Sequence, residues 1–261
     1  MLHGLGAATA WSVLQRNGEA LQARFEARKD VAREVERFRQ RAAEIGSIDE
    51  LMKDRRTLTF VLEAFQLESE VDKRAVVRRL LTDDPADLGS FANRMVDPRY
   101  RQINQTFGFD DPTRPPLADP ERVEAIIRKT LTNRFEKANG EANPGLREAM
   151  YFKRIIGTVS DVKGLMGDRV LTAVARTALG LPKQFGLLDY EQQKAILEKR
   201  LDPQKFKDPA WVNRFVQRYL TLNEDAAGPA SDPRLALFGG GGDGTANGLL
   251  GLVGATLNLR L

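Results

Sequence analysis

The sequence contains no cysteine and a single histidine, His3, among 261 residues. The lack of cysteine excludes disulfides, thiolate metal sites and thiol nucleophiles. Histidine is the usual general base, and histidine or cysteine the usual ligand of a transition metal. We therefore expect no catalytic, metal-binding or cofactor-binding residues, and predict that the protein is not an enzyme. Two carboxylates could still serve as acid and base, but no spacing singles out one pair among 36 acidic residues.

Long apolar runs and a strong charge of one sign are also lacking. No stretch approaches the roughly 20 apolar residues of a transmembrane helix, so we expect no membrane span. Forty basic and 36 acidic residues leave a net charge of +4. This balance does not predict nucleic-acid binding, because such proteins usually concentrate basic side chains on one face. The opening MLHGLGAATAWSVL has no basic region, so we expect no cleavable signal peptide and a soluble, cytoplasmic chain unless a signal-independent system exports it.

The sequence does contain a repeated phrase. LMKDRRTLTFVLEAFQL at 51–67 and LMGDRVLTAVARTALGL at 165–181 both read Leu-Met-x-Asp-Arg, with a later Ala-x-x-Leu, at an offset of 114 residues. Two further matches keep the same order. They pair LQARFE at 21–26 with LTNRFE at 131–136, and FANR at 91–94 with WVNR at 211–214.

The collinear matches predict an internal duplication. We interpret residues 10–109 and 120–224 as two copies of one helical unit, joined by the proline-rich DDPTRPPLADP at 110–120. The predicted organisation is a first helical repeat at 1–112, a second at 113–225, and a Gly-rich linker with an apolar tail at 226–261.

Helical patterns extend over most of the chain. Val31, Val35, Phe38, Ala42 and Ile45 recur at steps of four and three, the stripe of an amphipathic helix. No segment alternates like a strand, so we predict an all-α fold. Seven of the twelve prolines follow an aspartate, a typical helix start in which the aspartate caps the first turn. These aspartates are Asp84, Asp97, Asp111, Asp119, Asp202, Asp208 and Asp232.

Two kinds of duplicated polar pair are candidate binding sites. For Asp54–Arg55 and Asp168–Arg169 we favour a structural role, with the aspartate capping a helix and the arginine bridging to a neighbour. For Asn93–Arg94 and Asn213–Arg214 we favour a tie between a helix and the adjoining loop. The alternative for the Asp–Arg pairs is a duplicated binding pair, and the alternative for the Asn–Arg pairs is a clamp for an anion or a carboxylate.

The C-terminal tail is the candidate partner-binding segment. A tetraglycine at 239–242 precedes a run of large aliphatic residues, and exposed apolar surface of this kind needs a cover. The run could fold back onto the body, dock on a partner or another copy, or contact a membrane. Our candidate residues are Leu249, Leu250, Leu252, Val253, Leu257 and Leu259.

The sequence also resembles a known family. Trp11-x-x-Leu14, DELMKDRRTLTFVLEAFQL at 49–67 and SFANRMVDPRYRQINQTFGF at 90–109 are similar to a domain-of-unknown-function family of alphaproteobacteria, whose genes commonly lie beside flagellar genes. Members typically have Phe-Gly-Leu where this chain has Phe65-Gln66-Leu67. The resemblance implies a role in flagellar assembly or structure and supplies no catalytic residues.

Three hypotheses follow for the function. The first is a non-enzymatic, flagellum-associated structural or assembly protein that acts through protein–protein contacts, with a flagellar partner and self-association through the tail. The second is a cytoplasmic helical adaptor or export chaperone that holds a partner helix in a groove. The third is a carboxylate-based cell-wall hydrolase. We favour the first.

Overall fold

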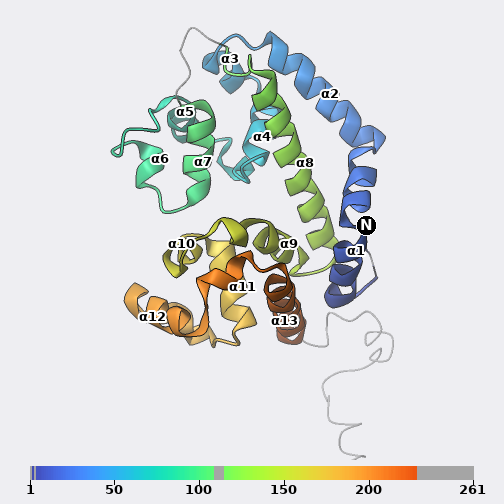
Figure 1. The fold of residues 1–261 in the computed structure, drawn as a ribbon. Coiled ribbons are helices and arrows are strands. Elements are labelled where there is room, and N and C mark those ends of the chain that lie inside the picture. Colours follow the sequence, from blue (N-terminus) through green and yellow to red (C-terminus); the bar gives the residue numbers. More distant parts are fainter. Residues whose placement is uncertain (1, 3, 109–114, 228–261) are drawn as a thin grey trace, which may run out of the picture. The chain divides into compact units, whose positions relative to one another are not determined.

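The computed structural model describes residues 2, 4–108 and 115–227, without the side chains of residues 183 and 224–227 (Figure 1). This part of the chain contains helices and no strand, which confirms the predicted all-α class. The described residues up to 224 form one compact unit. The predicted partner-binding residues, Leu249 to Leu259, lie outside the described residues.

The helices of the described residues are short, apart from four. The α-helices are α1 (Ala7–Glu26), α2 (Lys29–Glu44), α3 (Ile48–Lys53), α4 (Arg55–Glu63), α5 (Arg74–Thr82), α6 (Phe91–Arg94), α7 (Pro98–Phe107), α8 (Pro120–Ala142), α9 (Leu146–Ile155), α10 (Val162–Met166), α11 (Arg169–Ala178), α12 (Tyr190–Arg200) and α13 (Pro209–Ala227). The 3-10 turns are η1 (Glu68–Glu70), η2 (Ile156–Thr158), η3 (Lys183–Leu187) and η4 (Pro203–Lys207).

Two hydrophobic cores lie within this compact unit. One is built by α2 to α7 and the first half of α8, and Phe38 stacks on Phe60 inside it with ring centroids 4.2 Å apart. The other is built by the start of α1, the later part of α8 and the helices from α9 to α13. Phe152 stacks on Phe215 there, with centroids 5.4 Å apart. The amphipathic stripe predicted from Val31 to Ile45 is buried in the first core.

Two helices cross between the cores. The 23 residues of α8 span about 34 Å, so Ile126 packs in the first core while Phe135 packs in the second. Trp11 and Leu14 on α1 are buried in the second core, although they belong to the N-terminal half of the sequence. Each half that the repeat indicates therefore contributes residues to the core of the other half. The predicted border near residue 112 stays a prediction.

Aspartates before prolines cap helices as the sequence predicts. In each case the side chain accepts a backbone N–H from the first turn, and the residues are Asp97, Asp119, Asp202 and Asp208. Asp84 differs because its carboxylate accepts the N–H of Ala86 in a turn that does not continue as a helix. Asp111 and Asp232 lie outside the described residues.

Asp54 and Asp168 cap α4 and α11, the role predicted for them. Asp54 accepts the Thr57 N–H at 3.0 Å and an Arg41 N–H at 2.9 Å. The Asp168 carboxylate accepts two backbone N–H groups, and the Tyr151 hydroxyl donates to it at 2.6 Å. Burial and this hydrogen bond to Asp168 both raise the pKa of Tyr151. Asp168 is therefore buried and accepts a hydrogen bond from a buried side chain, whereas Asp54 is only partly buried.

The helices that these aspartates begin also end alike. Gln66 after α4 and Gly180 after α11 both have a positive φ, of 56° and 65°. In each turn the following leucine N–H returns to a carbonyl five residues earlier, which is a Schellman-type end that favours glycine. Gln66 is not a glycine, but its side chain donates to the Asn133 Oδ1 at 3.1 Å. This hydrogen bond to α8 offsets the cost of the left-handed backbone.

The first prediction separates these two effects at Gln66. Gln66→Ala removes the hydrogen bond to Asn133 and keeps the unfavourable φ, so it should lower the free energy of unfolding by about 1 kcal/mol. Gln66→Gly also loses the bond but relieves the backbone, so its stability should lie about 1 kcal/mol above that of Gln66→Ala. Urea unfolding of both variants measures this difference. A glycine variant no more stable than the alanine variant would show that the turn stores no strain.

The second prediction compares the two capping aspartates. Asp54→Ala should cost about 0.5–2 kcal/mol, the usual price of an N-cap. Asp168→Ala should cost more, because it also leaves the buried Tyr151 hydroxyl unpaired, which adds about 1–3 kcal/mol. A double-mutant cycle with Tyr151→Phe, read by chemical denaturation, isolates this second contribution. Equal losses for Asp54→Ala and Asp168→Ala, with no coupling to Tyr151, would contradict the expectation.

Candidate functional site

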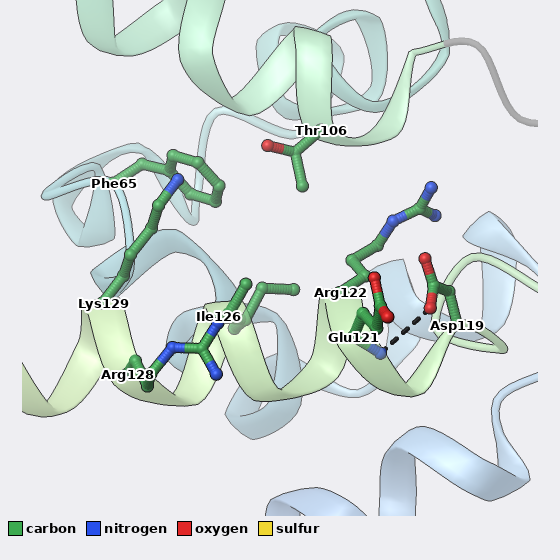
Figure 2. Close-up of a pocket in the computed structure, with 9 residues that line it drawn as sticks. Phe65, Thr106, Asp119, Glu121, Arg122, Ile126, Arg128 and Lys129 are labelled. Carbon is green, nitrogen blue, oxygen red and sulfur yellow. Dashed lines mark hydrogen bonds between the residues drawn. The ribbon is translucent and has the colours of Figure 1, made fainter.

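A cavity of about 360 Å³ opens between α7, the turn after α4 and the first half of α8 (Figure 2). Its size lies at the lower end of the range for small-ligand sites. The lining combines three cations, two acids, one hydroxyl and three apolar residues. They are Phe65, Thr106, Asp119, Glu121, Arg122, Ala125, Ile126, Arg128 and Lys129.

One face of α8 supplies most of this lining. Asp119 caps the helix and Pro120 begins it, which fixes where the first turn lies. Arg122, Ile126 and Lys129 follow at steps of four and three, so they lie along one side of the helix. Figure 2 shows them below the cavity, with Phe65 and Thr106 reaching toward it from the other elements.

Lys129 is the cation at one end of the cavity. Its ammonium lies 4.6 Å from the centre of the Phe65 ring, a cation–π contact. Partial burial, and then the positive charge of Arg154, lower the pKa of Lys129. Among the described residues no carboxylate forms an ion pair with it. The Lys129 side chain is therefore charged without a counter-ion from the described part of the protein.

The acids lie at the other end of the same face. Asp119 is ten residues before Lys129, or about 15 Å along the helix axis. Its carboxylate is committed to the cap, where it accepts the Glu121 N–H at 2.9 Å. The Thr106 hydroxyl donates to the Gln102 carbonyl of its own helix. The lining thus has no nucleophile paired with a base, and its chemistry suits binding.

A second cluster of charges joins α8 to its neighbours. Arg154 on α9 donates to both oxygens of Glu136, at 2.8 and 3.0 Å, and that carboxylate is only 2% exposed. Arg134 on α8 pairs with Glu63 on α4 and Glu34 on α2. These side chains satisfy one another, so the cluster holds helices together and leaves little room for a ligand.

A third candidate is an exposed basic surface at the end of α12. We define it by Lys199, Arg200, Lys205 and Lys207, all exposed. Within the described residues none of the four forms an ion pair. The neighbouring acids are occupied as helix caps, since Asp202 and Asp208 each accept a backbone N–H. The four cations outnumber these two carboxylates, so the surface keeps a net positive charge.

Two exposed apolar side chains lie at the other end of α12, about 15 Å along the helix axis from Arg200. Leu187 is 85% exposed and Tyr190, the first residue of α12, is 47% exposed. Leu197 is the only fully buried residue of α12, which packs chiefly against α10. Thus α12 buries little of its surface and exposes apolar side chains at one end and basic side chains at the other. Such a surface is typical of a protein contact site.

The ties predicted for the duplicated polar pairs are present at Arg55 and Asn93, whereas Arg169 forms no ion pair within the described residues. Arg55 forms an ion pair with Asp72, which lies in the turn between η1 and α5. The Asn93 side chain donates to two loop carbonyls, at 2.8 Å each, and so ties α6 to the preceding loop as predicted. The Asn213 Oδ1, by contrast, is buried without a hydrogen-bond partner among the described residues.

Neither the cavity nor the basic surface was predicted from the sequence. Lys129 and the four cations of α12 and η4 are surface residues in a chain with 40 such side chains, so their type alone gives no signal. The described residues hold no cluster of acids or histidine that could bind a metal. Within the same part of the chain no helix is long and apolar enough to cross a membrane.

Comparison with known proteins places the chain in a family. No curated protein matches it. A crystal structure of a protein from Agrobacterium tumefaciens, a target of the Northeast Structural Genomics Consortium, is similar, with 27% identity and a TM-score of 0.72 over 83% of this chain and 92% of that chain. The model of the family described as "Protein of unknown function (DUF1217)" matches residues 64–212, more than half of the sequence. The chain therefore belongs to the DUF1217 family.

Proposed function

We propose that this protein is a non-enzymatic structural or assembly protein that acts through protein–protein contacts. The observation that carries the proposal is the basic surface of α12 and η4, together with Leu187 and Tyr190, which are exposed at the start of α12. Apolar side chains supply the affinity of such a contact, and the charges steer the partner and select for acidity. The surface therefore favours a partner that presents acidic and apolar side chains together.

The polar groups of the fold support a scaffold role. Asp54 and Asp168 cap helices, and Glu136 is fully engaged by Arg154. The lining of the cavity likewise offers no base next to a nucleophile. These groups stabilise helices and their packing, which is the work expected of a scaffold.

The flagellar part of the proposal rests on the sequence resemblance. The stretches at 49–67 and 90–109 resemble proteins whose genes lie beside flagellar genes. We propose a flagellar partner on that ground. We also propose that the apolar run from Leu249 to Leu259 contributes to partner binding or self-association, as the sequence suggests.

An internal duplication would explain several pairs of like features. Asp54 and Asp168 cap α4 and α11, 114 residues apart, and the turns after these helices have positive φ at Gln66 and Gly180, again 114 apart. Phe91 and Trp211, partly buried, pack against the first and the second core respectively. These likenesses support the proposal that two copies of one unit gave rise to the fold.

The third prediction tests the basic surface by charge reversal. Lys205→Glu with Lys207→Glu should leave the thermal midpoint unchanged, because both side chains are exposed, and should remove the protein from the fraction that holds its partner. Lys29→Glu with Lys53→Glu is the matched control, since it makes the same charge change on other exposed lysines. The measurement is the amount of each variant in purified flagella and in cytoplasm of the bacterium that encodes the protein.

The outcomes separate the parts of the proposal. Loss from the flagellar fraction by the α12–η4 variant alone supports the surface and the flagellar partner together. If both double variants are lost from the flagellar fraction to the same extent, the basic surface is not the partner-binding site. A wild-type protein absent from purified flagella, in a cell whose motility does not depend on it, rejects the flagellar role.

A further inference from the structure

The cavity between α7 and α8 has a charge arrangement that the scaffold role does not require. Arg128 and Lys129 lie toward one end of its α8 wall, whereas at the other end two acids, Asp119 and Glu121, outnumber one cation, Arg122. A structural ion network brings opposite charges together, as Arg154 and Glu136 do at 2.8 Å. Separated charges along one wall of a cavity instead create a field that an incoming charge experiences.

The cationic end offers an anion two donors that the described residues leave without a direct ion pair. Arg128 and Lys129 are both exposed at the rim of the cavity, and neither forms an ion pair with another described residue. The Lys129 ammonium lies over the Phe65 ring, so an anion bound to this ammonium would lie near an aromatic side chain. Both causes of the lowered pKa of Lys129, burial and the charge of Arg154, would be offset by a bound negative group.

The wall between the two ends is apolar. Ala125 and Ile126 form it on α8, and Phe65 closes it from the turn after α4. At the far end Asp119 and Glu121 outnumber Arg122, so this end favours an anion less than the end with Arg128 and Lys129. A ligand is therefore oriented with its negative group at Lys129 and an uncharged, apolar body along Ala125 and Ile126.

We propose that this cavity binds a carboxylate carried on a small apolar or aromatic body, with Lys129 and Arg128 holding the carboxylate. This site goes beyond the proposed scaffold function and does not depend on it, since its residues are distant in sequence from α12 and η4. The same chemistry has two sources, a free small carboxylic acid and the C-terminal carboxylate of a peptide.

The test is an NMR titration of the full chain, labelled with nitrogen-15, using benzoate as the probe. Benzoate should shift the amide signals of Phe65, Thr106 and Lys129 with a Kd of about 1 mM, as expected for a ligand of so few atoms. Benzylamine has a similar shape and the opposite charge, and it should give no such shifts. Inorganic phosphate should bind more weakly, because it lacks the apolar body.

Two lysines of α8 provide matched variants. Lys129→Met should weaken benzoate binding at least tenfold, whereas Lys137→Met, two turns along the helix and not part of the cavity lining, should leave it unchanged. The thermal midpoint of Lys129→Met should be unaltered or slightly higher than that of the wild type, because the change removes a cation that has no counter-ion among the described residues. This measurement separates lost binding from lost folding.

A pair of peptides distinguishes the two sources. N-acetyl-Gly-Phe with a free C-terminal carboxylate, bound more tightly than benzoate and more tightly than its C-terminal amide, assigns the site to a peptide end. Benzoate bound more tightly than the peptide acid assigns it to a free small acid. Three results would each overturn the proposal. The first is the absence of localised shifts with either probe at about 10 mM, tenfold above the expected Kd. The others are benzylamine binding as tightly as benzoate, and Lys129→Met binding benzoate as tightly as the wild type.

Discussion

The fold depends on the ion pair between Glu136 and Arg154. The Glu136 carboxylate is almost fully withdrawn from water, and Arg154 compensates it with two hydrogen bonds from the neighbouring helix. Arg154 also donates to Asn133, whose side chain binds Gln66 and the Glu63 carbonyl in the first core. One arginine thus links α9 to α8 and, through α8, to the end of α4. The pair adds little stability by itself, but loss of Arg154 would leave the buried Glu136 carboxylate uncompensated, so we infer that the pair fixes how the two cores meet.

The position of α8 also arranges the surfaces to which we assign function. Its first half packs in the core of the N-terminal helices and lines the cavity with Ile126 and Lys129. Its later part packs Phe135 against the core that carries α12 and η4. The cavity and the basic surface therefore belong to different cores of one unit. A rigid connection between the cores would let a protein partner and a small ligand bind without competing for the same residues.

Local structure followed from the sequence more fully than the arrangement of the cores. Asp-Pro pairs marked helix starts, and steps of three and four marked the buried stripe of α2, because capping and amphipathicity are local. The burial of Trp11 among C-terminal helices could not be predicted, since it depends on where α8 directs the chain. Lys129 was missed for a related reason. Its place at a cavity depends on Phe65, which approaches from another element 64 residues earlier in the sequence.

Hydrogen exchange tests most directly the claim that Glu136 and Arg154 join the cores. Arg154→Leu leaves a buried carboxylate uncompensated and should destabilise the protein by about 3–5 kcal/mol. Mass spectrometry of the exchanging chain can follow peptides of α4 in the first core and α11 in the second. We expect the slowest amides of both helices to lose protection by the same amount, because the cores unfold together. Loss of protection confined to α11, with α4 unchanged, would contradict it.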